Sequence, residues 1–384
     1  MRWRFETAHR YRRSRSVNNQ VLTARALRAQ TRKGAMRLTD LTMGGGCGCK
    51  IAPGHLKQLL GGAPDRSEPL PWLLVGREGN EDSAAFRIRD GQVALTSLDF
   101  FPPIVDDPLL WGRIASCNAI SDIYAMGGEP LLATAILGFP TDKLDDDVIR
   151  KVLDGARSAC TEAGIPIAGG HSINLSEPIF GLSVIGQVEA RRMLRNSTSR
   201  PGDVIALTKP IGVGLVVSAI KDRIAGFEET SPHYAAAMGI VTTLNSFGAI
   251  VSGVEGVSAM TDVTGFGLIG HLHEMALGAG TTARVVISEI PLMAAAVGLA
   301  ESGRQTGGAK RNYAHYGADV SASPTIPEWK LRLLCDPQTN GGLLITVAAD
   351  ALPAVSSLAQ RQGQALFVIG EMHERGERPI IIAA

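Results

Sequence analysis

Apolar segments of strand character alternate with helical segments along most of the chain, and this alternation restricts the possible fold more than any other feature. In the first half we predict helices at 56–60, 111–126 and 141–164, and strands at 84–88, 93–97, 131–139, 165–168 and 179–188. In the second half we predict strands at 203–208, 258–262, 284–288, 343–348 and 366–369, and a helix at 268–276. Strands mixed with helices on both sides of residue 195 indicate an α+β protein with two mixed α/β domains.

The expected boundary between these domains is a short polar connection. The segment 189–201 contains four arginines together with asparagine and serine, and strands are predicted on both sides of it. A chain of 384 residues is long enough for two ordinary domains. We therefore predict an amino-terminal domain at 38–195, a carboxy-terminal domain at 196–384, and an extension at 1–37.

The extension at 1–37 differs from the remaining chain in charge. It holds eleven Lys/Arg and a single acidic residue, Glu6, whereas the remaining chain holds 27 basic and 36 acidic residues. A basic arm of this kind can bind nucleic acid or serve as a transit-like segment. The alternative, which we favour, is a disordered extension that translation from a second start at Met36 would omit. The acidic body offers no basic surface for nucleic acid.

Composition places the chain among globular proteins of a reducing compartment. Hydrophobic residues make up 45% and charged residues 20%, and no apolar run is long enough to span a bilayer. Five cysteines without regular spacing argue against a secreted disulfide framework. We therefore expect a cytoplasmic protein without a membrane partner.

A glycine-rich stretch at 43–50, with the sequence MGGGCGCK, carries the most reactive side chains. Its glycines allow close approach to a ligand, and a nearby ammonium group such as that of Lys50 lowers the pKa of a thiol. The stretch is not a P-loop, because Ile51 follows Lys50 where Ser or Thr is required. It is also not a zinc site, because the other cysteines are isolated. A mobile catalytic loop is therefore expected, with a flexible linker as the alternative.

Four aspartates recur beside the ends of predicted strands or helices and close to glycines or other small residues. They are Asp82, Asp99, Asp122 and Asp262. Carboxylates of this kind can bind Mg²⁺ together with substrate phosphates, and glycine backbone N–H groups can bind the phosphates. Each aspartate alone is better explained as a turn or cap residue. Together with the glycine-containing segments 76–82, 169–172 and 265–267, they predict a nucleotide–metal site.

Several other polar or reactive residues are expected to have structural roles. Cys160 continues the apolar stripe of the helix at 141–164, and Cys117 is expected to pack within the helix at 111–126. His271 and His273 are two residues apart on a helix and so face different directions. Lys209 is interpreted as a surface charge in a turn.

The chain resembles the selenophosphate synthetase (selenide, water dikinase) family of the aminoimidazole ribonucleotide synthetase-like, or PurM-like, superfamily. The resemblance covers roughly residues 38–375 and rests on long motifs rather than isolated residues. These motifs are GGCGCK (45–50), SLDFFPPIVDDP (97–108), NAISDIYAMGGEP (118–130), AGGHSI (168–173), LTKPIGVG (207–214), MTDVTGFGLIGHLHEM (260–275) and LLCDPQTNGGLL (333–344).

The resemblance implies a homodimer of two-domain subunits and the reaction of selenide, ATP and water to selenophosphate, AMP and phosphate. It implies that Cys47 and Lys50 are catalytic and that Asp82, Asp122 and Asp262 bind Mg²⁺. It further implies that ATP is bound by Lys50, Gly79, Asn80, Glu81, Asp99, Asp122, Gly170, His171 and Ser172. Three features depart from the family pattern: Cys47 stands where some relatives have selenocysteine, Asn340 where serine is common, and 1–37 has no counterpart.

Two other functions compete with this reading. Another enzyme of the superfamily would keep the aspartates but lack the GCGCK loop, which is present here. A nucleotide-binding redox or sensor protein would bind ATP without turnover. Phosphorus NMR with ATP, Mg²⁺ and selenide separates these possibilities.

Overall fold

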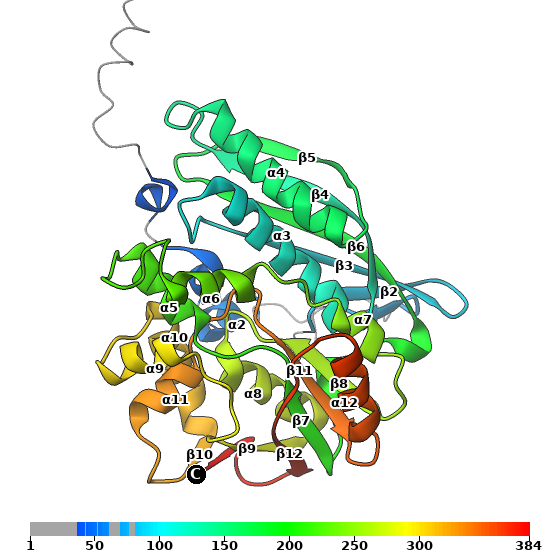
Figure 1. Cartoon of the computed structure of the whole chain (residues 1–384). Coiled ribbons are helices and arrows are strands. Elements are labelled where there is room, and N and C mark those ends of the chain that lie inside the picture. Colours follow the sequence, from blue (N-terminus) through cyan, green and yellow to red (C-terminus); the bar gives the residue numbers. More distant parts are fainter. Residues whose placement is uncertain (1–36, 43, 52, 61–69, 77–80) are drawn as a thin grey trace, which may run out of the picture. The chain divides into compact units, whose positions relative to one another are not determined.

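A computed structural model describes residues 37–42, 44–51, 53–60, 70–76 and 81–384. Residues 38–384 belong to one compact unit, which contains two β-sheets and their covering helices (Figure 1). None of the helices within the described ranges is long and apolar enough to cross a membrane. The extension at 1–37 falls almost entirely outside the described residues, so its predicted disorder stays a prediction.

The amino-terminal sheet has six strands in the order β1-β2-β3-β6-β4-β5. All neighbouring strands are antiparallel except β4 and β5, which are parallel. The strands are β1 (Leu73–Val75), β2 (Ala84–Arg89), β3 (Gln92–Phe101), β4 (Glu129–Phe139), β5 (Ile167–Asn174) and β6 (Ile179–Glu189).

Helices α3 (Pro108–Ala125) and α4 (Asp146–Glu162) lie on one face of this sheet (Figure 1). Asp107 begins α3, because its side chain accepts hydrogen bonds from the backbone N–H groups of the first helical turn, and Pro108 fits there. The helices pack closely at two glycines: a Cβ atom at Gly112 would lie 1.9 Å from the carbonyl oxygen of Val152. Because α3 also contacts β8 and α7, it is buried nearly all round and joins the two halves of the protein.

The other face of the six-stranded sheet exposes large apolar side chains. Leu98 is 53% exposed and Phe100 is 48% exposed, both on β3. The same face carries Phe86, Ile88, Ile173 and Ile185, which are also exposed. A monomeric protein rarely leaves so many large apolar groups together on one surface.

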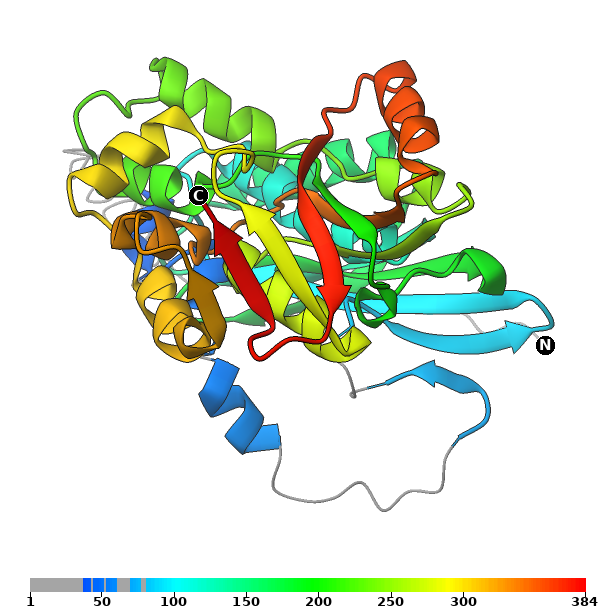
Figure 2. The ribbon, with the colours of Figure 1, turned by 90° about the horizontal axis from the view of Figure 1, so that it is seen from below.

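The carboxy-terminal sheet has seven strands in the order β10-β13-β9-β12-β7-β11-β8. Figure 2 shows β13 in dark red beside β9 in yellow, with β12 and β7 following. The strands are β7 (Asp203–Leu207), β8 (Val257–Asp262), β9 (Thr281–Val286), β10 (Val320–Ala322), β11 (Leu343–Ala348), β12 (Phe367–Glu374) and β13 (Ile380–Ala383). Strand β8 lies at one edge and delivers Asp262 at its carboxyl end.

The remaining helices of the described residues pack against the sheets or against one another. They are α2 (Pro53–Leu60), α5 (Val213–Lys221), α6 (Pro232–Val241), α7 (Phe247–Val251), α8 (Gly267–Ala279), α9 (Ala294–Glu301), α10 (Gly307–Tyr316), α11 (Glu328–Leu334) and α12 (Leu352–Arg361). Short 3-10 helices are η1 (Leu38–Leu41), η2 (Gly46–Cys49), η3 (Ala190–Arg192), η4 (Asn196–Thr198) and η5 (Gly317–Asp319).

The α+β fold expected from the alternation of strands and helices is confirmed. The main local difference concerns β5, which was expected to end at residue 168 but continues to Asn174. Parallel pairing with β4 from Ala133 to Phe139 keeps the glycines in the strand, because β4 supplies hydrogen-bonding partners for their backbone. The segment 169–172 is therefore a strand rather than a loop.

The burial of individual side chains agrees with one expectation and contradicts another. Cys117 and Cys160 are buried, as expected for packing residues. The expectation that Lys209 is a surface charge is wrong, because Lys209 is only 6% exposed. Its ammonium group donates to the carbonyl oxygens of Thr243 and Asn340, which lie in turns that the tertiary structure brings together.

Candidate active site

Three of the predicted aspartates converge in one cluster. Asp82 precedes β2, Asp122 lies in the last turns of α3, and Asp262 ends β8. One carboxylate oxygen from each lies within 4.8 Å of the others. The segments that carry them are up to 180 positions apart in the chain, so the two sheets and α3 together create the cluster.

The cluster provides carboxylate oxygens of the kind that bind divalent cations, and two of these oxygens have no other partner among the described residues. Asp82 accepts a hydrogen bond from the Thr261 hydroxyl at 2.8 Å, and Ser97 donates to Asp122. Asp82 Oδ2 and Asp262 Oδ2 are buried and have no hydrogen-bond partner among the described residues. Buried carboxylate oxygens without partners are costly, and oxygen ligands of this kind suit Mg²⁺. The residues therefore fit a magnesium ion.

The pKa values of these carboxyl groups reflect their burial and their closeness to one another. Burial, followed by repulsion from Asp262 and Asp122, raises the pKa of Asp82 well above its usual value. Burial and the neighbouring Asp99 and Asp262 raise the pKa of Asp122 in the same direction. Burial also raises the pKa of Asp262 to about 6. A bound cation would remove this repulsion and favour the ionised form of all three groups.

The glycine-rich loop reaches this region through Lys50. The Lys50 ammonium nitrogen lies 3.7 Å from Asp99 Oδ1, and the backbone N–H of Gly46 donates to the carbonyl oxygen of Pro102 at 3.2 Å. Asp99 lies near the end of β3, on the face covered by α3. The predicted loop cation and one predicted nucleotide-binding aspartate are thus neighbours. The side chain of Cys47 lies outside the described part of the chain, although its backbone belongs to η2.

A buried polar network that the sequence did not reveal supports Asp99. Asn118 donates from Nδ2 to Asp99 Oδ2 at 2.6 Å, and its Oδ1 accepts from the backbone N–H of Asn340 at 2.7 Å. The Asn340 carbonyl in turn accepts from the Lys209 ammonium at 2.9 Å, and burial lowers the pKa of Lys209 to about 7. Spacing does place Asn118 on the Asp122 face of α3, four residues earlier, which is the signal that could have identified it.

Asn340, the position where the family commonly has serine, adopts a left-handed backbone conformation with φ of +48°. Asparagine tolerates this conformation better than most residues other than glycine. Its side-chain amide donates to the carbonyl oxygens of Val241 and Thr243. The residue therefore holds a turn of the carboxy-terminal half against the end of α6.

Glu81, predicted to contact ATP, is engaged inside the protein. Its Oε1 accepts from Arg195 at 3.0 Å and from the Ser197 hydroxyl at 2.6 Å, while Oε2 accepts from the backbone N–H of Asn196 at 2.6 Å. Its side chain is fully buried. In this structure Glu81 ties the segment before β2 to the connection between the two sheets. Its neighbours Gly79 and Asn80 lie outside the described residues.

The predicted nucleotide residues Gly170, His171 and Ser172 lie on β5, at the edge of the sheet and separated from β3 by β4 and β6. Cross-strand pairing puts Gly170 in the row of Asp99, and His171 in the next row with Phe100 on the open face. Because successive side chains on a strand point to opposite faces, His171 is on the side of the sheet away from Asp99. A single chain therefore does not bring His171 to the acidic cluster.

Two family models match the chain in the order of the two sheets. The model described as "AIR synthase related protein, N-terminal domain" matches residues 80–188, and "AIR synthase related protein, C-terminal domain" matches residues 200–382. Among curated proteins, selenide, water dikinase of Paraburkholderia xenovorans is 49% identical over 341 residues, which are 88% of this chain and 94% of that protein. The chain belongs to the selenide, water dikinase family. Selenide, water dikinase of Rhizobium meliloti is 47% identical over a stretch that covers 86% of this chain and 94% of that protein.

Solved structures of lower identity share the fold of this selenide, water dikinase family member. Thiamine-monophosphate kinase from Stenotrophomonas maltophilia aligns with a TM-score of 0.60 and 17% identity, over 87% of this chain and 96% of that one. A HypE–HypF complex gives 0.60 and 17%, over 85% and 95%. The PurM-like fold expected from the motifs is confirmed. Family membership makes the chain a kinase-type enzyme that forms selenophosphate, and the alternative of a sensor without turnover is not supported.

Proposed function

We propose that the chain converts selenide, ATP and water to selenophosphate, AMP and phosphate at the acidic cluster facing the glycine-rich loop. The observation that carries the proposal is the convergence of Asp82, Asp122 and Asp262 within 4.8 Å, in a chain whose Lys50 reaches Asp99. Cleaving two phosphate bonds requires positioning and charge neutralisation rather than covalent chemistry from the protein.

In this proposal Asp82, Asp122 and Asp262 hold Mg²⁺. The chemistry that the ion would supply there is neutralisation of charge on the triphosphate. Two of the three aspartates offer a buried oxygen without a partner among the described residues, so binding needs no existing hydrogen bond to be broken. Ser97 and Thr261 keep the other oxygens of the cluster oriented.

The residues around the cluster would bind ATP. Lys50 lies close enough to the end of β3 for its ammonium group to contact a triphosphate there, and Asn118 holds the Asp99 carboxylate in place. Cys47 would receive selenide, because a soft anion suits a thiol better than a carboxylate site. Gly79, Asn80 and Glu81 are proposed to line the nucleotide, with Glu81 held by its bonds to the connection at 195–197.

We further propose that the enzyme is a homodimer formed through the open face of the six-stranded sheet. Exposed Leu98, Phe100 and Ile173 would be buried there against the same face of a second copy. His171 lies on that face in the row of Phe100, so pairing would place it at the border between subunits. Gly170, His171 and Ser172 would then contribute to a nucleotide site that one chain leaves incomplete.

Two further assignments support this picture. We propose domains at 38–195 and 196–384, because each half carries its own sheet and the connection between them is tied by Glu81.

We propose the cytoplasm as the compartment, because cysteines 49, 117, 160 and 335 are all free thiols.

The decisive experiment is anaerobic phosphorus NMR of the protein with ATP and Mg²⁺, with and without selenide. We expect signals of selenophosphate, AMP and phosphate only when selenide is present. Cys47→Ala should abolish selenide-dependent AMP formation, whereas the matched variant Cys49→Ala should only reduce it. Formation of AMP without selenide, or an active Cys47→Ala variant, contradicts the proposal.

A further inference from the structure

A cavity lies beside the glycine-rich loop. It has a volume of about 350 Å³, and its wall combines the loop with helices α5 and α10 of the carboxy-terminal half. None of the four aspartates of the candidate active site lines it. The cavity is lined by residues of the loop (Gly44, Gly45, Gly48, Cys49), of the α5 region (Gly214, Val217, Ser218, Lys221, Asp222), of the α10 region (Gln305, Thr306, Gly307, Gly308, Arg311), and by Ile104, Pro337 and Thr339.

Two cations are fixed at the wall of this cavity by the loop itself. The Lys221 ammonium donates to the carbonyl oxygen of Gly44 at 2.9 Å and to that of Thr42 at 3.2 Å. Arg311 donates from one guanidinium nitrogen to the carbonyl oxygen of Gly48 at 2.8 Å. Arg311 uses one of its five donors in this contact and retains capacity for a ligand. The three donors of Lys221 are met by these two carbonyl oxygens and by the Thr42 hydroxyl, which lies at 3.5 Å and is a long contact that a ligand could replace.

The acidic residue at the wall is already neutralised. Asp222 accepts from Arg304 at 2.6 Å, and these two side chains form an ion pair. Lys221 and Arg311 therefore leave the cavity with an excess of positive charge. Such a surface favours a small anion.

The cavity also presents a thiol. Cys49 lines it, and a Cβ atom at Gly44 would lie 2.5 Å from Cys49 Sγ, so glycine is needed there for the sulfur to occupy its position. Burial raises the pKa of Cys49, while the charges of Lys221 and Arg311 act in the opposite direction. A soft sulfur beside two cations suits an anion of a soft element.

The start of α10, which also lines the cavity, adds backbone donors. Thr306 begins the helix, its hydroxyl accepting from the backbone N–H of Ala309 at 3.0 Å, and two glycines follow it. A Cβ atom at Gly308 would lie 2.3 Å from a carbon of Pro337, so a larger residue does not fit. The amino end of a helix carries partial positive charge, which adds to that of the cations.

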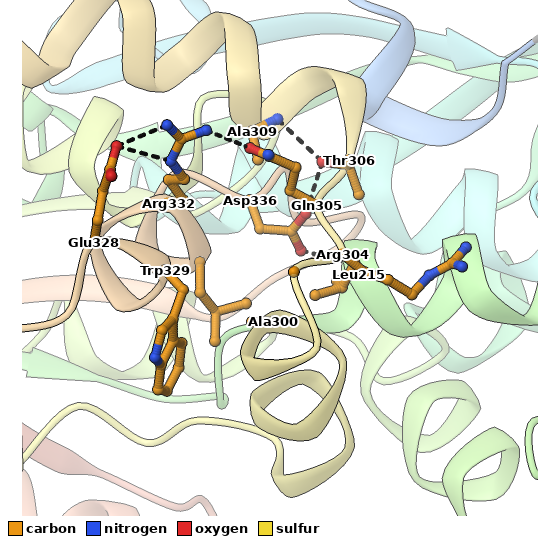
Figure 3. Close-up of a pocket in the computed structure, with 12 residues that line it drawn as sticks. Leu215, Ala300, Arg304, Gln305, Thr306, Ala309, Glu328, Trp329, Arg332 and Asp336 are labelled. Atoms are coloured by element: carbon orange, nitrogen blue, oxygen red, sulfur yellow. Dashed lines mark hydrogen bonds and ion pairs between the residues drawn. The ribbon is translucent and has the colours of Figure 1, made fainter.

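A neighbouring cavity of about 220 Å³ shares Gln305 and Thr306 with this one. Figure 3 shows its wall, where Arg332 is bonded to Glu328 and to Gln305, and Thr306 lies beside the buried Asp336. Arg304 lines this smaller cavity while its partner Asp222 lines the larger one. The Arg304–Asp222 ion pair thus stands between the two.

We propose that the cavity between the loop and helices α5 and α10 binds the anionic selenium substrate, hydrogen selenide, with Lys221 and Arg311 as its cationic ligands and Cys49 beside it. The proposal rests on the proposed function. Lys50 lies against Asp99 and Cys49 lines this cavity, so the anion would be held beside the same loop that carries Cys47, the residue proposed to receive it.

The test is direct binding of sodium selenide by anaerobic calorimetry in the absence of ATP and Mg²⁺, so that no turnover is needed. We expect Arg311→Gln and Lys221→Gln each to weaken selenide binding by about tenfold, as loss of one charge-assisted contact requires. Arg311→Lys and Lys221→Arg keep the charge and should restore most of the affinity. Arg157→Gln, an exposed arginine of α4 distant in the fold, is the matched control and should bind as wild type does.

Kinetics provide the second readout. In selenide-dependent AMP formation, Arg311→Gln should raise KM for selenide by about tenfold while KM for ATP changes less than about twofold. Wild-type protein that binds no selenide without ATP would overturn the proposal, and so would equal rises in both KM values. Selenide binding by a wild-type protein that forms no AMP would instead contradict the proposed function and leave the binding site standing.

Discussion

Replacing Asn118 by alanine tests whether the buried polar network positions the candidate active site. Asn118 is fully buried in α3 and joins Asp99 of the six-stranded sheet to Asn340 of the carboxy-terminal half. The variant removes a charge-assisted hydrogen bond and a neutral one, and it leaves the buried N–H of Asn340 without its acceptor. No other single side chain described above connects the two halves directly to Asp99, which is proposed to bind the nucleotide.

The expected cost follows from these contacts. A hydrogen bond to a charged group contributes about 2 kcal/mol and a neutral one about 1 kcal/mol, and an unsatisfied buried N–H adds about 1 kcal/mol. Asn118→Ala should therefore lower the free energy of unfolding by about 4 kcal/mol. ATP affinity should fall by about tenfold, because an unsupported Asp99 no longer holds a single position next to Lys50.

Ser116→Ala is the matched control, because Ser116 is equally buried on α3 but its hydroxyl donates only to Gly112 of its own helix. Its removal should cost less than about 1 kcal/mol. The measurements are urea unfolding followed by tryptophan fluorescence and ATP binding by calorimetry. If Asn118→Ala costs no more than Ser116→Ala, or binds ATP as wild type does, the network has no positioning role.

Asn118→Asp separates the two bonds of this residue. The variant keeps an acceptor for the Asn340 N–H but places a second carboxyl group against Asp99, and burial with a like charge raises the pKa of such a group. A carboxyl whose pKa is higher in the folded than in the unfolded state destabilises the protein as pH rises above the unfolded value. Relative to wild type, the variant should therefore lose stability between about pH 4 and pH 7. A difference that does not change with pH refutes this reasoning.

Three further predictions concern other parts of the molecule. Asp262→Asn should weaken Mg²⁺–ATP binding in calorimetry by about tenfold. Because the pKa of Asp262 is raised to about 6, the metal-free variant should be at least as stable as wild type at pH 8. A variant that is less stable than wild type at this pH would contradict the charge repulsion among the aspartates. Phe100→Asp should convert a dimer into a monomer in light scattering, whereas the exposed helix variant Arg157→Gln should not, and a dimeric Phe100→Asp protein would exclude the open face as the interface. Removing residues 1–35 should leave the melting temperature and AMP formation unchanged, and a large loss of either would give the basic extension a role.

The sequence by itself determined the fold class, part of the elements and the chemical inventory of this protein, whereas elements such as α6, α10, β10 and β13 were not predicted. Alternating strands and helices gave the α+β architecture, because side-chain periodicity reports directly on which face of an element is buried. The long motifs identified the family, and placed Asp82, Asp122 and Asp262 beside the ends of elements. The helix at 141–164 was recognised from its apolar stripe, although the structure begins it only at Asp146.

Tertiary structure decided which of these residues meet. Strand order across the first sheet puts His171 on the face away from Asp99, and nothing in the local sequence contains that order. Lys209 is buried because Thr243 and Asn340 supply carbonyl oxygens from turns 34 and 131 residues further along the chain. Local patterns report on contacts within one element, whereas the acidic cluster, the Asn118 network and the cavity beside Cys49 arise from the packing of elements distant in the chain.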